Sequence, residues 1–195
     1  MSEPKRRENH MGTQDFIAYY LTELNELFNI DPANALVTIE YPHHEVHEGN
    51  FYTLSTQGTI AAGTATALKL FMRPGVGTTM HFQGVVAAKN SGWVQLWENV
   101  TYGGGAVTVP KNNDRTSLHV FNGTCNIGGT IVTYGTLLQS RAVGASSPGV
   151  RLGAEAGTRN EWIFNPNYWY MLWFIADNAT TQISLDAEWY VEDIM

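Results

Sequence analysis

The stretch QISLDAEWYVE at residues 182–192 decides the expected fold, because apolar and polar side chains alternate along its whole length. The apolar side chains are Ile183, Leu185, Ala187, Trp189 and Val191. Successive side chains of a strand point to opposite faces of its sheet, so the pattern predicts a strand with one face against a core. We expect the other face, from Gln182 to Glu192, to meet water or a partner.

The residues upstream predict further strands. Residues 168–175 form a nearly continuous aromatic and aliphatic run, which indicates a central strand that is buried on both faces. Shorter runs between Gly-, Asn- and Pro-containing turns predict strands over 37–41, 51–55, 68–72, 78–86, 93–100, 107–109, 118–121, 130–138 and 162–164. Asn90-Ser91-Gly92 is typical of a hairpin turn, and residues 139–160 predict a long irregular segment.

These strands follow one another without helices between them, which favours antiparallel pairing. About eight to ten short strands suit a two-sheet sandwich. The expected fold class is therefore all-β: an antiparallel, jelly-roll-like β-sandwich with one N-terminal α-helix. Three parts are expected along the chain: a flexible basic arm over 1–12, a helix and turn over 13–34, and the sandwich domain over 35–195.

The expected N-terminal helix has an apolar stripe. Apolar side chains recur at helical spacing between Thr13 and Asn29. They are Phe16, Ile17, Tyr20, Leu24 and Leu27. Such a stripe is buried either on the helix's own sandwich or against another copy or a host surface. We therefore take these five residues as candidate interface residues.

A histidine-rich stretch, YPHHEVHEGNFYTLS, occupies residues 41–55. The proline at its second position argues against a helix, so we expect a strand in which His43, Glu45 and His47 share one face and His44 lies on the other. Two imidazoles and a carboxylate are suitable ligands for iron or zinc. The alternative is a polar strand whose histidines form hydrogen bonds with neighbours or with another subunit. Because no fourth ligand is evident, we assign no metal and no cofactor, and take the three histidines as candidate interface residues.

The composition excludes several classes of function. The chain has 195 residues, which fits one domain with a sizeable core, and its net charge of -7 argues against nucleic-acid binding through the bulk surface. A single cysteine, Cys125, excludes an internal disulfide framework and indicates maturation in a reducing cytoplasm. No apolar run is long enough to span a bilayer, and the basic start at Lys5-Arg6-Arg7 lacks the apolar run of a signal peptide.

The sequence also lacks a recognisable catalytic constellation. There is no Gly-x-Ser-x-Gly elbow, the carboxylates are scattered, and Gly103-Gly104-Gly105 has no following Lys-Ser/Thr to form a phosphate cradle. We expect no catalytic residues and no enzymatic activity. Two alternatives stay open. One is a cupin-like metal enzyme that uses His43, Glu45 and His47, and the other is a lectin or receptor binder whose exposed Trp and Tyr side chains stack on sugars.

Several short motifs follow the order found in a family of tailed-bacteriophage virion proteins. After the histidine-rich stretch they are His81-Phe82, Leu96-Trp97-Glu98, Gly103-Gly104-Gly105, Asn112-Asn113-Asp114-Arg115 and Glu188-Trp189-Tyr190-Val191-Glu192. The fourth resembles the family's Asn-x-Asn-Arg segment, and the last resembles its Trp-Tyr-Glu terminus. The likeness spans about residues 37–192. The chain departs from the family pattern at the inserted Val191 and in the long segment 139–160.

The resemblance to these capsid decoration (cement) proteins implies a virion protein that binds the outer surface of an assembled phage head as a homotrimer and stabilises it. The implied partners are further copies of the chain and the major capsid protein, with no nucleic acid and no membrane. The implied location is the capsid surface of the virion, after assembly in the host bacterial cytoplasm. Glu98 and Arg115 become candidate interface residues, as a polar pair within or between subunits. The alternative is a head- or tail-associated module that binds carbohydrate or a receptor, with a surface glycan as partner.

Overall fold

The structure is a computed structural model that describes residues 41–144, 150–152, 161–177 and 179–194. One compact unit spans Pro42–Met195. The helix expected over 13–29, with its candidate interface residues Phe16, Ile17, Tyr20, Leu24 and Leu27, lies outside the described residues. None of the helices among the described residues is long and apolar enough to cross a membrane.

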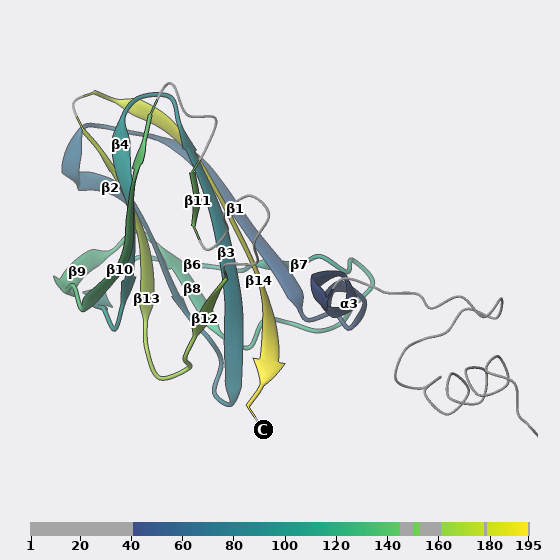
Figure 1. Ribbon diagram of the computed structural model, residues 1–195. Helices are drawn as coiled ribbons and strands as arrows, with labels where there is room; N and C mark the ends of the chain where they lie inside the picture. The colour runs from purple at the N-terminus through teal and green to yellow at the C-terminus, as the bar shows by residue number, and fades with distance from the viewer. Residues whose placement is uncertain (1–40, 145–149, 153–160, 178, 195) are drawn as a thin grey trace, which may run out of the picture. The chain divides into compact units, whose positions relative to one another are not determined.

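Two antiparallel sheets form the two layers of this unit, and each has six strands among the described residues (Figure 1). The first sheet has the order β11 (Val150–Leu152), β3 (Thr78–Ala88), β14 (Thr181–Asp193), β1 (Phe51–Ile60) and β7 (Lys111–Asn112), and β12 (Trp162–Phe164) also pairs with β3. The second has the order β10 (Thr136–Val143), β4 (Gly92–Glu98), β13 (Tyr170–Ala176), β2 (Gly63–Arg73), β8 (Thr124–Ile127) and β6 (Ala106–Thr108). A further antiparallel pair consists of β5 (Thr101–Gly103) and β9 (Thr130–Thr133).

The strand pairing has the nested order of a jelly roll. The first long strand, β1, pairs with the last, β14, and β2 pairs with β13. Further in, β3 pairs with β11 and β12, and β4 pairs with β10. The second half of the chain therefore returns antiparallel along the first half, and successive pairs alternate between the two sheets. The expected all-β antiparallel sandwich is confirmed.

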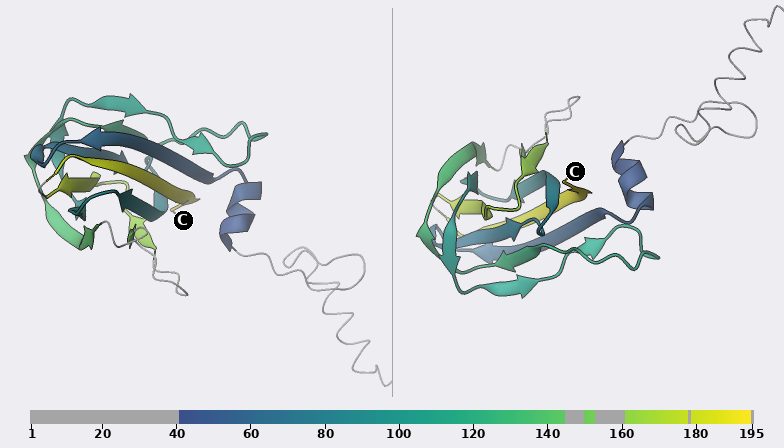
Figure 2. Two further views of the ribbon diagram at one scale, coloured as in Figure 1. Left: turned by 90° about the horizontal axis from the view of Figure 1, so that it is seen from above. Right: turned by 90° about the horizontal axis from the view of Figure 1, so that it is seen from below.

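The hydrophobic core lies between the facing sheets, which Figure 2 shows from above and below. From the first sheet, Phe82 and Trp189 are among the largest side chains that are fully buried. From the second sheet, Leu96 and Tyr170 meet them. Along β14 the odd-numbered residues from Thr181 to Trp189 are buried, so the alternation of this strand is confirmed. Burial of such side chains from both sheets is the main stabilising term of a sandwich.

The second sheet also has a covered outer face. The central strand β13 is buried on both faces, as its continuous apolar run predicts. Its outward side chains Met171 and Trp173 form a second cluster with Phe71 and Val100. Two side chains of the insertion, Tyr102 of β5 and Ile131 of β9, pack over this cluster. Three further partly buried side chains pack against it: Trp97, Trp169 and Ile175. The middle of this sheet's outer face is therefore a second, smaller core.

An insertion at residues 99–135 separates β4 from β10 and carries the strands β5 to β9. Its strand β7 extends the first sheet by pairing with β1, and β8 extends the second sheet by pairing with β2. Asn99 opens the insertion with a positive φ of 58°, a conformation that Asn tolerates better than most residues. The insertion thus widens both sheets at one edge and covers the outer face of the second.

Four expectations about local structure are wrong. Asn90-Ser91-Gly92 does not form a hairpin turn, because β3 and β4 belong to different sheets and this segment crosses between them. Residues 118–121 form no strand, although Phe121 packs on the core. The strand expected over 130–138 is two strands, separated at Gly135, whose φ is 68°. The segment 139–160 is not irregular throughout, because β10 continues to Val143 and β11 occupies 150–152.

The strand expected in the histidine-rich stretch is also wrong. Residues Tyr41–His47 form a helix, α3, and the first strand begins only at Phe51. Pro42 lies in the first turn of α3, where its missing N–H costs no hydrogen bond and its fixed φ suits a helix. Gly49 follows the helix with a φ of 75°. A Cβ added there would overlap the side chain of Ser117, so the chain requires glycine where it leaves this helix.

Candidate functional site

Helix α3 is fixed to the end of the sandwich where β1 begins. The backbone N–H of Asn50 donates to the carbonyl of Glu45, 2.9 Å away, and its side chain donates to Oε2 of Glu45 at 3.3 Å. The amide of Asn112 in β7 donates to the carbonyl of Gly49 at 2.6 Å. The backbone N–H of Val191 in β14 donates to the carbonyl of Asn50. A buried carboxylate and two strands therefore hold this short helix in place, although an isolated helix of this length is unstable.

The histidines of α3 divide between two faces. Nε2 of His43 lies 2.9 Å from Nε2 of His47, one turn along the helix, and the two rings are 4.8 Å apart. His44 faces Glu45 and Glu48, with nitrogen–oxygen distances of 3.6 and 3.7 Å. Residues four apart share a face in a strand and also in a helix, so His43 and His47 stay together as expected. Residues two apart share a face in a strand but not in a helix, so the carboxylate of Glu45 is removed from their face.

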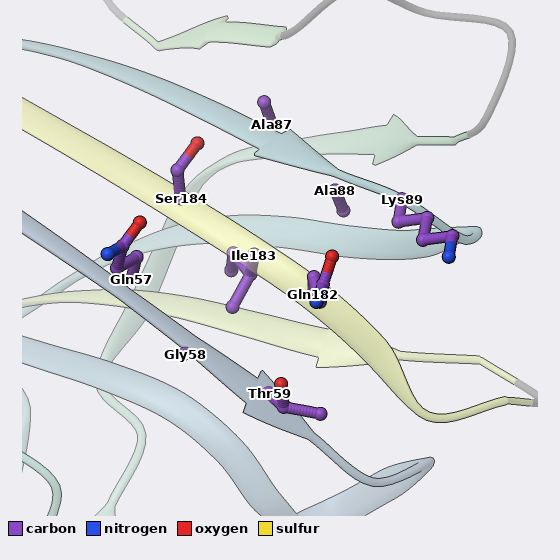
Figure 3. Close-up of a pocket in the computed structure, with 9 residues that line it drawn as sticks. All are labelled: Gln57, Gly58, Thr59, Ala87, Ala88, Lys89, Gln182, Ile183 and Ser184. Atoms are coloured by element: carbon purple, nitrogen blue, oxygen red, sulfur yellow. The ribbon is translucent and has the colours of Figure 1, made fainter.

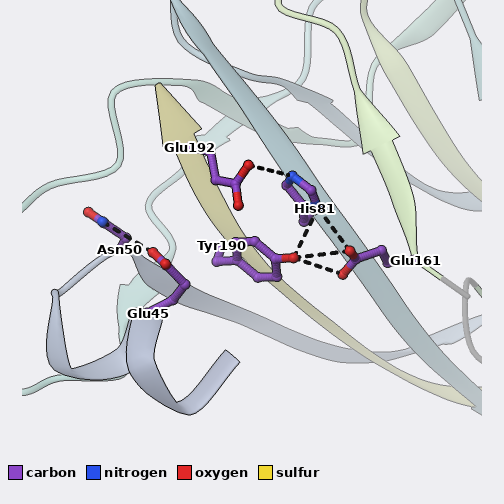
Figure 4. Close-up of polar contacts among 6 residues, drawn as sticks. All are labelled: Glu45, Asn50, His81, Glu161, Tyr190 and Glu192. Atoms are coloured by element: carbon purple, nitrogen blue, oxygen red, sulfur yellow. Dashed lines mark hydrogen bonds and ion pairs between the residues drawn. The ribbon is translucent and has the colours of Figure 1, made fainter. Parts of the chain in front are cut away.

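A second polar cluster lies on the outer face of the first sheet (Figure 4). His81 in β3 lies directly opposite Tyr190 in β14, and their rings stack at 4.4 Å. Nδ1 of His81 is 2.9 Å from Oε1 of Glu161, and Nε2 is 3.2 Å from Oε2 of Glu192. The Tyr190 hydroxyl donates to both oxygens of Glu161, at 3.0 and 3.2 Å. We call these four residues the outer-face tetrad.

In the outer-face tetrad, both imidazole nitrogens of His81 have a carboxylate partner. His81 is 9% exposed and Tyr190 6%, although both lie on the face of the sheet that points away from the core. A doubly protonated imidazole would donate to a carboxylate at each nitrogen. The contacts join the residue that precedes β12 to two central strands and to the end of β14. The arrangement is suited to holding chain segments together rather than to presenting a free base.

Sequence reasoning missed this tetrad. It placed Tyr190 on the face of its strand that meets water or a partner, and it gave His81 no partner. The signal available was a histidine in one strand and a tyrosine in another, with no indication of their register. Glu161 stands next to an irregular segment, so nothing in the local pattern connects it to either strand.

Glu98 and Arg115, expected as a polar pair, have separate partners in the structure. The Tyr170 hydroxyl donates to Oε1 of Glu98 at 2.9 Å, at the end of the inner face of the second sheet. Arg115 donates to the backbone carbonyl of Asn112 at 3.4 Å, in the insertion. The two side chains have these separate partners within the described subunit, and a pair between subunits stays a prediction.

Aromatic side chains reach the surface on the outer face of the second sheet. Trp93, Gln95 and Trp97 alternate along one face of β4, and Nε1 of Trp97 donates to Oε1 of Gln95 at 3.1 Å. Trp93 is 45% exposed. Tyr134, 46% exposed, packs against Trp97 with a ring distance of 5.4 Å. We call these four residues the aromatic strip.

The most exposed apolar side chains lie in the insertion. Among the described residues, six large apolar side chains are at least 70% exposed, and five of them lie within 99–135. These five are Val107, Val109, Leu118, Val120 and Val132. We call them the insertion patch. They share one segment of the sequence, on β6, on β9 and in the loops after β6 and β7, and their exposure leaves apolar area open to a partner.

Two hollows accompany these surfaces. A groove of about 850 Å³ lies where α3, β1 and β7 meet, and Val46, Val109 and Asn112 are among the residues that line it. A shallower polar hollow of about 760 Å³ lies over the far ends of β1, β3 and β14 (Figure 3). Gln57, Gln182 and other short or polar side chains line the second hollow, so it offers hydrogen bonds and little apolar area.

Burial suppresses the ionisation of two core groups. It raises the pKa of the Cys125 thiol to about 12, which makes this side chain an unreactive core residue. It also raises the pKa of Tyr170, and the negative charge of Glu98 beside the hydroxyl acts in the same direction.

Among the described residues, no group of three or more His, Cys, Asp or Glu side chains forms a closed metal-binding cluster. Compared with known proteins, the chain matches no family model and no curated protein sequence.

Proposed function

We propose that the chain is a structural protein of a bacteriophage virion, a decoration protein that binds the outer surface of an assembled head as a homotrimer and stabilises it. The observation that carries the proposal is the insertion patch. Its five apolar side chains lie on one insertion and are strongly exposed in a single copy of the chain. Their exposure is explained if another copy of the chain, or the shell, covers these side chains in the assembly.

The fold supports the same proposal. Jelly rolls are common among viral capsid proteins, and they also occur in lectins and cupins, so the fold by itself does not select the function. The short motifs that resemble the decoration family add to it. The partners proposed are further copies of this chain and the major capsid protein, on the capsid surface, with no enzymatic role.

Cosedimentation with phage heads tests this proposal. The purified chain is mixed in one sample with phage heads that lack it, and in another sample with free coat subunits of the same phage. We expect the chain to sediment with assembled heads and not to bind free subunits. A double variant, Val107→Asp with Leu118→Asp, should lose binding, whereas Val76→Asp should retain it. Val76 is the matched control because it is 94% exposed and lies outside the insertion, in the turn between β2 and β3.

Equal binding by the wild type and the double variant would show that the insertion patch does not bind the shell. Binding to free coat subunits but not to heads would argue against a decoration role altogether. Raising the temperature of the decorated heads gives a second readout, because a cementing protein should raise the temperature at which they open.

A second candidate is a carbohydrate-binding module on the head or tail, and the aromatic strip favours it. Exposed Trp and Tyr side chains stack on sugar faces, and Gln95 supplies amide groups between them. A glycan array tests this candidate. Specific binding that is lost in Trp93→Ala and kept in Val76→Asp would support it, and an array without specific binding would contradict it.

A further inference from the structure

The imidazoles of His43 and His47 form a pair with the geometry of a metal chelate. Both side chains are exposed on α3, and their Nε2 atoms are 2.9 Å apart. The helix that sets this distance is held at its end by Glu45, Asn50 and Asn112, through the contacts described above. The pair is therefore presented on a fixed element and is open to solvent.

The separation fits two neighbouring positions around one ion. Nitrogen atoms that each lie about 2.0–2.1 Å from a metal, and 2.9 Å from each other, subtend roughly 90° at it. This is the angle between adjacent ligands in octahedral and square-planar complexes. Such geometries are typical of Ni²⁺ and Cu²⁺, and imidazole is a suitable ligand for both ions and for Zn²⁺.

A hydrogen bond between the rings is the state that a metal would replace. At 2.9 Å, one neutral imidazole can donate its Nε2 proton to the other ring. For an ion to accept a lone pair from both Nε2 atoms, the ring that donates this hydrogen bond must carry its proton on Nδ1 instead, so that each neutral ring keeps one proton.

We propose that His43 and His47 bind a divalent transition-metal ion through their two Nε2 atoms. The site is open, because no third protein ligand completes it within the part of the chain that the structure describes. Water fills the remaining positions. The affinity follows the general order for nitrogen ligands, with Cu²⁺ and Ni²⁺ ahead of Co²⁺. The bound ion links two successive turns of α3 and stabilises the helix.

Calorimetric titration with Ni²⁺ tests the proposal on the full-length, untagged, metal-free protein. The variants are His43→Ala, His47→Ala and His44→Ala. The last is the matched control, because His44 is equally a histidine of α3 but faces Glu45 and Glu48. We expect the wild type and His44→Ala to bind with the same affinity. Loss of either chelating ring should weaken binding by at least about tenfold.

A further variant and a second readout distinguish the pair from His10, the first histidine of the chain. His10 lies outside the described residues, and His10→Ala should bind Ni²⁺ as the wild type does. At one Ni²⁺ concentration, the melting temperature should rise more in the wild type and His44→Ala than in His43→Ala and His47→Ala. Both chelating rings are exposed, so the variants should fold, which circular dichroism checks. Unchanged affinity in His47→Ala, or an equal loss in His44→Ala, would overturn the proposal.

Discussion

The outer faces of the two sheets are built on opposite principles. The outer face of the first sheet carries mostly polar side chains, with exceptions such as Val85, and most of them are exposed or half-buried. The middle of the outer face of the second sheet is apolar and is covered by β5 and β9 of the insertion. One sheet is therefore an ordinary half-buried layer, whereas the other is buried on both faces along its central strand β13. The comparison shows that the insertion is an integral third layer rather than an appended loop.

The largest expected effect comes from removing a side chain of the covered face. Phe71→Ala should lower the free energy of unfolding by about 3–5 kcal/mol, because it removes a fully buried ring that stacks on Tyr102. Glu188→Ala, on the exposed outer face of β14, should change it by less than about 0.5 kcal/mol. Denaturant unfolding of both variants measures the difference. A cost below about 1 kcal/mol for Phe71→Ala would show that the outer cluster is not a packed core.

Two tyrosine hydroxyls sharpen the comparison between polar and apolar faces. Tyr190→Phe removes a donor to the carboxylate of Glu161 and should cost about 2 kcal/mol, because hydrogen bonds to charged groups are stronger than neutral ones. Tyr102→Phe removes a neutral bond with Asn126 and should cost about 1 kcal/mol. Denaturant unfolding at neutral pH measures both. The reverse order would mean that the outer-face tetrad contributes little to stability.

The burial of the core between the two sheets is tested through Cys125. Its raised pKa, about 12, means that the folded thiol stays neutral while the unfolded thiol ionises near its ordinary value. Above that value the unfolded state binds fewer protons, so the free energy of unfolding falls as pH rises. We expect a loss of about 1 kcal/mol between pH 8 and pH 9.5 that is absent in Cys125→Ala. A thiol reagent should label Cys125 at pH 8 only after unfolding, and rapid labelling of the folded protein would contradict its burial.

The sequence predicted those parts of the fold in which one strand carries its own signal. The alternation of β14 and the continuous apolar run of β13 each revealed how many of their faces are buried. Patterns shared by two kinds of structure were not decisive. Residues 41–47 fit a strand by alternation, but a proline in the first turn and a glycine after the last allow a helix, and contacts with β7 and β14 stabilise it.

The candidate sites could be predicted only where the spacing of residues along the sequence decides which side chains meet. The pairing of His43 with His47 follows from a four-residue separation that serves both structures, and it could be predicted. The outer-face tetrad depends on the register of β3 against β14 and on the return of Glu161 from a distant part of the chain. The insertion patch arises because Leu118 and Val120 remain outside a strand, where a β-rich apolar run predicted one. Long-range pairing decides both cases, and local pattern carries no information about it.

The most direct test of the account is the mass of the full-length protein in solution, measured by light scattering over a range of concentrations. We predict a trimer, three times the 21.6 kDa of one chain. Val107→Asp with Leu118→Asp should dissociate it, whereas Val76→Asp and Leu24→Asp should not, because we propose that the insertion patch makes the contact. A trimer lost only in Leu24→Asp would assign assembly to the N-terminal helix. A wild-type monomer at every concentration would contradict the homotrimeric decoration role.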